Sequence, residues 1–312
     1  MLLIDFLVFV IGCTGVVLSS NFVVKSLIRV EEYYHLREFV VGFLVVGVLT
    51  SFPELSVGII SSLSEISSLS FGDVLGSNVI NIALVMGLVA FIGKNIRFEA
   101  QLEKTTLFFI SAMVFLPMIL FLDQELSRID GIILIAAFVL YVIRLLMIRK
   151  KFKKADSGNV HKIRVYKNIA ILIVSLLVLI GSARLLVYSA SEIALALSFP
   201  LVVIGLMIVS VGTSLPELSL ELGCVLRGHC SVALGDLLGS LAFNSTLILG
   251  IVSLISPIRA PFSSFAISSF FIIISLASFL FFARSGRTIT RKEGTILLLI
   301  FAMFIISNIL FR

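Results

Sequence analysis

Long stretches of apolar residues, separated by short polar segments, occupy most of this chain of 312 residues. An α-helix that crosses a bilayer needs about 20 predominantly apolar residues. Ten stretches meet that requirement, at residues 2–28, 38–63, 72–92, 105–122, 129–148, 168–194, 200–226, 233–255, 262–283 and 292–311. The pattern therefore predicts an all-α polytopic membrane protein with ten transmembrane helices.

A set of polar residues occurs twice in this apolar background, at a constant separation of 163 positions. The first copy is TSFPEL at 50–55, GDVLGS at 72–77 and Asn81; the second is TSLPEL at 213–218, GDLLGS at 235–240 and Asn244. One register kept over so many polar positions indicates a duplicated unit. Each copy also places a carboxylate inside an apolar segment, where an ionisable group is costly and marks a functional site.

The loops predict how the two copies are oriented. The long polar connection 149–167 separates residues 1–148 from 168–312, and it carries eight Lys or Arg and one Asp, so it is expected to be cytoplasmic. With that loop inside, 19 of the 24 Lys and Arg residues fall on the cytoplasmic side, and both termini are outside. Since each half has five predicted spans, the halves insert as inverted repeats. Transporters built this way bind their substrate near the midplane, between the repeats.

Composition supports the membrane assignment and excludes several classes of protein. The chain is 59% hydrophobic and 13% charged, with a mean hydropathy of +1.20, which is not the composition of a soluble protein. Its pI near 9.4 does not indicate nucleic-acid binding, because the basic residues lie in short loops. Its three cysteines suggest neither a disulfide framework nor a CxxC metal site. We expect a monomer in the cell membrane, with no cofactor and no partner but the lipid bilayer and transported ions.

The repeated residues are oxygen donors. Pro53 and Pro216 lack an N–H and clash with the carbonyl four residues back, so they are expected to free carbonyls around Thr50 and Thr213. Freed carbonyls at membrane depth are tolerated only where protein, water or an ion satisfies them. Ser77 lies four residues before Asn81 on one helix face, as Ser240 does before Asn244. Carboxylate, hydroxyl, amide and carbonyl oxygens together suit hard cations such as Ca²⁺.

Two inverted copies that meet at a pseudo-two-fold axis would bring four side chains together, those of Glu54, Glu217, Asn81 and Asn244. Two carboxylates carry a formal charge of −2, which one Ca²⁺ neutralises. Several Na⁺ ions could occupy overlapping oxygen sites instead. Mutually exclusive occupancy by the two ions is the physical basis of exchange.

The doubled motif resembles the α-repeats of the sodium/calcium exchangers, a branch of the cation/calcium antiporter superfamily. The resemblance covers residues 38–92 and 200–255 and extends to the ten-helix layout. It implies a Na⁺/Ca²⁺ antiporter that works by alternating access, in which the first helix of each half slides against the other eight. It implies that Glu54 and Glu217 share the ion and that Thr50 and Thr213 donate backbone carbonyls. Further implied ligands are Ser51, Ser214, Ser77 and Ser240 for Na⁺, and Asn81 and Asn244 for the central site.

Some residues depart from the family pattern. Leu49 stands where the motif usually has Gly, and Asp73 and Asp236 replace the commoner Asn. Both aspartates are interpreted as helix N-caps or first-turn acids. Asn at both 81 and 244 argues against K⁺ co-transport, because relatives that carry K⁺ have Asp at one of these positions. Glu221 has no repeated polar partner and is interpreted as structural or interfacial.

Other interpretations compete with these. A buried Glu could pair with Arg144 or Arg184, and Ser77 or Ser240 could serve only as a small packing residue. The Ser-rich stretch 61–70 is expected to be an external loop. The alternative transport function is proton-coupled exchange of a divalent cation, Ca²⁺ or Mn²⁺. No predicted span contains His, and HExxH is absent, so an intramembrane enzyme is not expected.

Overall fold

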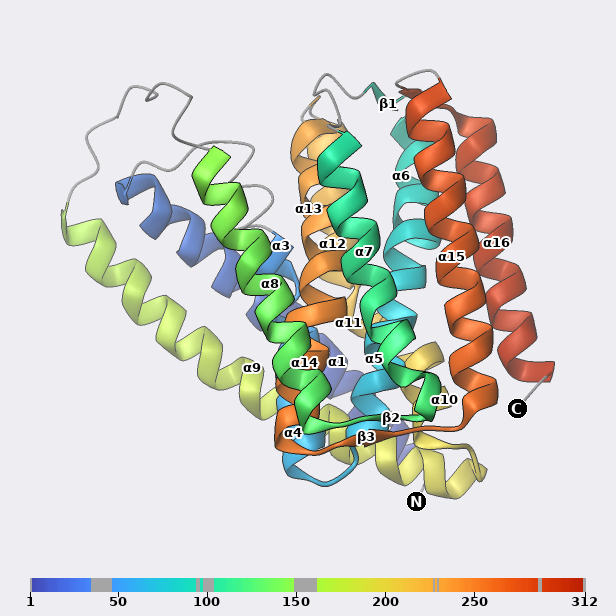
Figure 1. The fold of residues 1–312 in the computed structure, drawn as a ribbon. Helices are drawn as coiled ribbons and strands as arrows, with labels where there is room; N and C mark the ends of the chain where they lie inside the picture. The colour runs from blue at the N-terminus through green and yellow to red at the C-terminus, as the bar shows by residue number, and fades with distance from the viewer. Residues whose placement is uncertain are drawn as a thin grey trace.

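The computed structural model describes residues 2–34, 47–93, 96–97, 104–148, 162–226, 228, 230–285 and 288–310, and helices dominate them (Figure 1). The first half contains α1 (Leu2–Tyr34), α3 (Gly47–Thr50), α4 (Phe52–Leu63), α5 (Ser67–Val79), the π-helix η2 (Ile80–Val85), α6 (Met86–Gly93), α7 (Lys104–Leu120), the 3-10 turn η3 (Phe121–Asp123) and α8 (Arg128–Ile148).

The second half repeats this order. It contains α9 (Lys162–Leu197), α10 (Leu201–Ile204), the π-helix η5 (Gly205–Val209), α11 (Ser210–Thr213), α12 (Leu215–Leu226), α13 (Cys230–Ala242), the π-helix η6 (Phe243–Ile248), α14 (Leu249–Ile255), α15 (Phe262–Ser285) and α16 (Arg291–Leu310).

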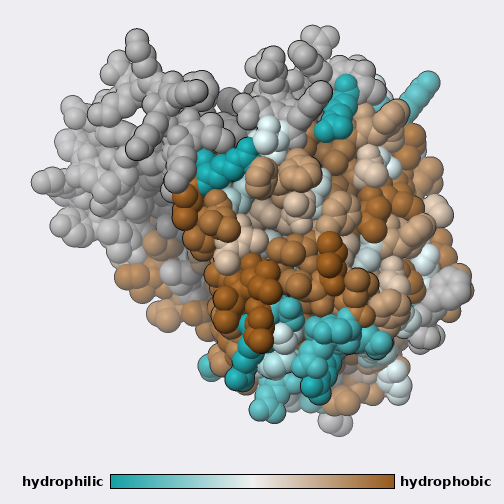
Figure 2. All heavy atoms as spheres, viewed as in Figure 1, coloured by the Kyte–Doolittle hydropathy of each residue, from teal (hydrophilic) through white to brown (hydrophobic). Residues whose placement is uncertain are grey.

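Membrane-length helices are present, as expected for a polytopic protein. Six helices in the described ranges are long and apolar enough to cross a bilayer, and the bent pair 201–213 and 215–226 makes a seventh candidate. Figure 2 shows a broad apolar band across the molecule, with hydrophilic residues gathered below it and at its upper margin. The number of ten spans remains a prediction. Residues 38–46 of the second predicted span lie outside the described residues.

Two boundaries differ from expectation. The predicted connection 149–167 ends early, because α9 already begins at Lys162; residues 149–161 lie outside the described residues. The Ser-rich stretch 61–70 is not an external loop. Only residues 64–66 turn, and the side chains of Ser61, Ser62, Ser67 and Ser70 are buried. Serine is common both in loops and at close helix contacts, so composition alone did not separate the two cases.

The central layer consists of α5–η2–α6 and α13–η6–α14. In each of these two continuous helices, 78% of the apolar 18-residue segment is buried inside the protein, whereas the figure for α16, on the periphery, is 28%. The long helices α1 and α9 pack along each other on one side of the molecule and are inclined to the remaining helices (Figure 1). The interior of the protein is therefore formed by the segments that carry the repeated GDxLGS and Asn residues.

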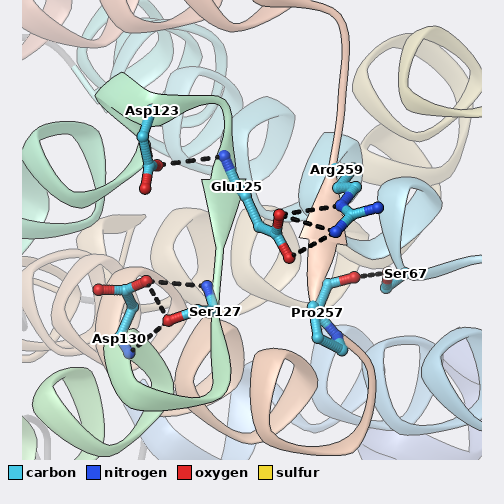
Figure 3. Close-up of polar contacts among 7 residues, drawn as sticks. All are labelled: Ser67, Asp123, Glu125, Ser127, Asp130, Pro257 and Arg259. Carbon is cyan, nitrogen blue, oxygen red and sulfur yellow. Dashed lines mark hydrogen bonds and ion pairs between the residues drawn. The ribbon is translucent and has the colours of Figure 1, made fainter.

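Two short antiparallel ladders, absent from the sequence-based prediction, tie the halves together at opposite ends of the bundle (Figure 1). One pairs β1 (Ile96–Arg97) with β4 (Thr288–Ile289), and the other pairs β2 (Glu125–Leu126) with β3 (Ile258–Arg259). Figure 3 shows the second ladder, where the Arg259 guanidinium donates two hydrogen bonds to the Glu125 carboxylate, at 2.9 and 3.1 Å. β1 and its counterpart β3 therefore lie at opposite ends.

Equivalent helices in the two halves also begin in the same way. The Asp130 carboxylate accepts hydrogen bonds from the Ser127 N–H and hydroxyl, at 2.8 and 2.7 Å, just before α8 (Figure 3). Before α16, the Glu293 carboxylate accepts the same pair of bonds from Thr290, at 2.7 and 2.8 Å. Both are capping boxes, which satisfy donors that a helix N-terminus leaves unpaired. Ser127 and Thr290 are again 163 residues apart.

Candidate cation site

The helices that carry Glu54 and Glu217 are interrupted one turn before each carboxylate. α3 ends at Thr50 and α4 starts at Phe52, with Ser51 between them at φ −83° and ψ 12°. In the second half Ser214 has φ −84° and ψ 3°, and the helices on its two sides are bent by 41°. The missing N–H of Pro53 and Pro216 accounts for both interruptions, as predicted. Each interruption lies at a buried position, next to buried hydroxyls.

The threonine of each copy binds the aspartate of the other. The Thr50 hydroxyl donates a hydrogen bond to Asp236 Oδ1 at 2.8 Å, and the Thr213 hydroxyl donates one to Asp73 Oδ1 at 3.0 Å. The same hydroxyls lie 3.3 Å from Ser240 Oγ and 3.4 Å from Ser77 Oγ. These contacts join residues more than 130 positions apart. The two contacts of Thr213 are those of Thr50 shifted by 163 positions.

This pairing corrects the interpretation of the aspartates. Asp73 is the seventh residue of α5 and Asp236 the seventh of α13, so neither is an N-cap or a first-turn acid. Both helices begin earlier than the hydropathy boundaries indicated, which places the two carboxylates in mid-helix, fully buried and directed at the other half. In each, the second oxygen, Oδ2, has no hydrogen-bond partner among the described residues.

Glu54 and Glu217 are fully buried, and neither carboxylate has a hydrogen-bond donor in the described part of the chain. The Thr213 hydroxyl also lies near Glu54, and its hydrogen bond to Asp73 measures 3.0 Å. The Glu217 and Glu54 carboxylates are close enough to interact electrostatically. Two buried carboxylates without donors or cationic partners are strongly unfavourable in a low-dielectric interior. The predicted alternative of a Glu–Arg pair is absent among the described residues, since the structure shows neither Arg144 nor Arg184 bonded to them.

Asn81 and Asn244 lie in π-helical turns, at the second position of η2 and of η6. Both side chains are fully buried, and their amide oxygen and nitrogen have no partner among the described residues. α4, which carries Glu54, packs against η6, and α12, which carries Glu217, packs against η2. Each carboxylate helix therefore meets the asparagine segment of the opposite half. π-Helical turns are rare and often occur at functional sites, but the sequence-based prediction assigned only regular helices here.

All ten predicted ligand residues are buried in the interior of the protein. The structure brings Thr50 to Ser240, and Thr213 to Ser77, while Ser51 and Ser214 keep unbonded hydroxyls. In the described ranges no three His, Cys, Asp or Glu side chains converge as a metal-binding group. The buried oxygens of these residues are a mixture of carboxylate and neutral donors, a ligand set that Ca²⁺ and Na⁺ accept.

Sequence reasoning missed two features of this region. It did not assign the Thr–Asp pairs, although the GDxLGS spacing and the threonine were both in the repeat. It also left Glu221 aside, because that residue has no counterpart acid 163 positions earlier. Glu221 is fully buried, and neither of its oxygens has a partner within the described residues. A charge inside an apolar segment was the available signal.

The Thr–Asp pairs allow a direct test of stability. We expect Thr50→Val to lower the free energy of unfolding by about 1–3 kcal/mol, because it removes the donor to a buried Asp236 oxygen. Thr50→Ser, which keeps the hydroxyl, should cost less. The control is Thr14→Val, because the Thr14 hydroxyl is exposed and donates to the Val10 carbonyl on its own helix. Thermal unfolding in detergent measures all three; equal losses for Thr50→Val and Thr14→Val would contradict the assignment.

Comparison with known proteins supports the duplicated arrangement. The family model described as sodium/calcium exchanger protein matches residues 4–147 and again residues 167–310. The two matches are themselves offset by 163 positions. Among curated proteins, the chain is 29% identical to the sodium/calcium exchanger MaX1 of Methanosarcina acetivorans, over 98% of this chain and 99% of that protein. It is 27% identical to the inner membrane protein YrbG of Escherichia coli, over 80% and 79%.

Solved structures of a sodium-calcium exchanger are also similar to this chain. The chain superposes on the sodium-calcium exchanger NCX_Mj soaked with Na⁺ and Sr²⁺ with a TM-score of 0.70, at 27% sequence identity, covering 98% of this chain and 99% of that one. A second NCX_Mj structure, soaked without Na⁺ and Ca²⁺, gives a TM-score of 0.67. Since the family model matches most of both halves, this integral membrane chain belongs to the sodium/calcium exchanger protein family.

Proposed function

We propose that this protein is a secondary-active antiporter that exchanges Na⁺ for Ca²⁺ by alternating access at one central site. The observation that carries the proposal is the pair of buried Glu54 and Glu217 carboxylates. They lack donors in the described residues, lie within electrostatic range of each other, and belong to helices that contact the opposite Asn81 and Asn244 segments. Such carboxylates are neutralised by a bound cation or by a proton, and the amide and hydroxyl oxygens around them favour a metal cation.

In this proposal Glu54 and Glu217 share the Ca²⁺, and their combined charge of −2 matches it. Asn81 and Asn244 contribute amide oxygens to the central position. Thr50 and Thr213 contribute backbone carbonyls, which the proline-induced interruptions make available. The hydroxyls of Ser51, Ser214, Ser77 and Ser240 contribute to Na⁺ positions around it. Because Na⁺ and Ca²⁺ use the same carboxylates, occupation by one excludes the other.

The proposed architecture is two inverted five-helix repeats, residues 1–148 and 168–312, joined by a basic cytoplasmic segment. The two-fold exchange of Thr–Asp bonds and the placement of β1 and β3 at opposite ends of the bundle support it. The start of α1 and the end of α16 lie toward the β2–β3 end, which we take as the outside (Figure 1). α1 and α9 pack mainly on each other, so sliding of this pair against the other helices is the proposed access movement.

Ion-replacement flux in proteoliposomes tests the function. With purified protein, uptake of radioactive Ca²⁺ should follow an imposed outward Na⁺ gradient and stop when Na⁺ is replaced by K⁺ or choline. Uptake should persist when a protonophore collapses the pH gradient. Ca²⁺ uptake driven by a pH gradient without Na⁺ would instead establish proton-coupled exchange. Uptake that needs neither gradient would refute antiport.

A further inference from the structure

Glu221 breaks the two-fold symmetry of the charged interior. It lies on α12, four residues after Glu217, so the two carboxylates lie on one helix face, a turn apart. Both Glu221 oxygens are buried and have no hydrogen-bond partner in the described residues. The central site already has two carboxylates from the repeated glutamates. Glu221 is therefore an additional negative charge that the repeat does not account for.

The counterpart of Glu221 in the first half is Gly58, where a side chain would be in tight contact with its neighbours. A Cβ built at Gly58 would lie 3.0 Å from Val252 Cγ2 and 3.1 Å from Ser70 Oγ. In the first half, neighbouring side chains pack closely around this position, and it carries no carboxylate. The second half has a carboxylate at the same place in the fold, so the two halves differ by one formal charge.

The surroundings of Glu221 in the second half follow from the repeat. The nearest neighbours of a Cβ at Gly58 are Ser70, Ile248 and Val252. The equivalent residues, each in the opposite half, are Ala233, Val85 and Val89, and all three are buried. Their elements, α13, η2 and α6, all pack against α12. The Ser70 hydroxyl of the first half is thus replaced by the Ala233 methyl group, and no other hydrogen-bond donor reaches Glu221 among the described residues. An unpaired carboxylate in apolar surroundings is costly unless a cation accompanies it.

Asp236 supplies the second acid. It lies one turn after Ala233 on α13, and its charge acts on Glu221. Thr50 bonds its Oδ1, whereas its Oδ2 is buried and unbonded among the described residues. Three unbonded carboxylate oxygens, two from Glu221 and one from Asp236, are therefore present between α12 and α13. Glu217, one turn earlier on α12, is near enough to interact electrostatically with both acids, although no three such side chains converge as a metal-binding group within the described residues.

We propose that Glu221 and Asp236 form an additional site for one monovalent cation, Na⁺, in the second half of the protein. Glu221 and Asp236 together carry a formal charge of −2, but the charge of Asp236 has a counterpart in the first half, Asp73. The second half therefore exceeds the first by one negative charge, that of Glu221, and one Na⁺ neutralises this excess. α12 runs from the interruption at Ser214 toward the end of the bundle that carries β1 (Figure 1), so this site lies between the central residues and that end. The inference rests on the proposed Na⁺/Ca²⁺ antiport, because it adds a Na⁺ to the ions bound there.

Counting bound Na⁺ tests this site directly. Purified protein in detergent, free of Ca²⁺, would be equilibrated with saturating radioactive Na⁺, and the ions bound per protein would be compared between variants. We expect Glu221→Gln to bind about one Na⁺ fewer than the natural protein, and Asp236→Asn to show the same loss. The second variant keeps the test valid if the first does not fold. Glu192→Gln is the matched control, because it removes a half-buried carboxylate from α9.

The outcomes separate this inference from the proposed function. If the natural protein exchanges Na⁺ for Ca²⁺ in vesicles and all variants bind the same number of Na⁺, the additional site is refuted and antiport stands. If the count falls by one only in Glu221→Gln and Asp236→Asn, the site is supported. If Glu221→Gln changes proton uptake, measured in weakly buffered solution, while the Na⁺ count is constant, Na⁺ is the wrong ion. Absence of exchange in the natural protein refutes the proposed function itself.

Discussion

Glu54→Gln and Glu217→Gln are each expected to reduce Na⁺-driven Ca²⁺ uptake by roughly 100-fold or more, because Ca²⁺ affinity depends strongly on the number of charged ligands. Each variant leaves one carboxylate for a divalent ion. The two losses should be similar, since the residues occupy equivalent positions in the two halves. Uptake of radioactive Ca²⁺ into proteoliposomes with an outward Na⁺ gradient measures the effect. Glu192→Gln should retain uptake within about twofold of the natural protein.

A stability measurement distinguishes an ion ligand from a structural residue. In Ca²⁺-free detergent, neither Gln variant should unfold at a lower temperature than the natural protein, because each removes a buried charge that has no partner. Added Ca²⁺ should raise the unfolding temperature of the natural protein but not of the variants, since a ligand stabilises only the state that binds it. Full exchange by Glu54→Gln, or equal Ca²⁺ stabilisation of all proteins, would contradict the assignment.

The second large effect concerns the close approach of the two halves, and we expect Gly205→Ala and Gly72→Ala to destabilise the protein by about 1–3 kcal/mol or more. A Cβ at Gly205 would collide with the Leu69 carbonyl and lie 2.8 Å from the Asp73 nitrogen. A Cβ at Gly72 would collide with the Val202 carbonyl. Both neighbours are backbone, so the helices themselves must move. That movement would also displace Asp73 from Thr213 and reduce transport.

Two other glycines provide matched controls. Gly181 on α9 and Gly223 on α12 have nothing within 4 Å of a built Cβ. Ala at these helical positions should leave stability unchanged or raise it by about 1 kcal/mol, because Ala has the higher helix propensity. Thermal unfolding in detergent, with gel filtration to confirm monodispersity, compares the four variants. If Gly72→Ala and Gly205→Ala were as stable as Gly181→Ala, the close contact would be refuted.

Much of the site could be predicted because its signals are local. Pro53 and Pro216 interrupt their helices for reasons contained in the proline ring, so the interruptions were predicted correctly. Gly72 and Gly76 are local signals too, because glycine lets a neighbouring helix approach closely, and in the structure a Cβ on either would collide with the backbone carbonyl of Val202 or Leu206. The roles of the ten predicted ligands remain predictions, although their burial is as expected of ligands at the centre of a membrane protein.

Other features depended on information that hydropathy does not carry. Asp73 and Asp236 were assigned to helix starts because the apolar segments began near them. α5 instead extends back to Ser67, through buried serines and the large residues Leu69 and Phe71, and α13 extends back to Cys230. The π-helical turns around Asn81 and Asn244 add a residue to a helical turn, a change that leaves no mark in an apolar pattern. Both errors concern the segments that face the opposite half.

The membrane class, the duplication and the pairs of residues to examine could be inferred without the structure, because length, hydropathy and spacing are properties of the chain read in order. Which polar atoms find hydrogen-bond partners depends on how the chain folds. Thr50 bonds Asp236 across 186 positions, while Glu54, Glu217 and Glu221 are left without donors among the described residues. A hydrogen bond depends on atoms within about 3 Å, and that proximity is created by folding one half against the other.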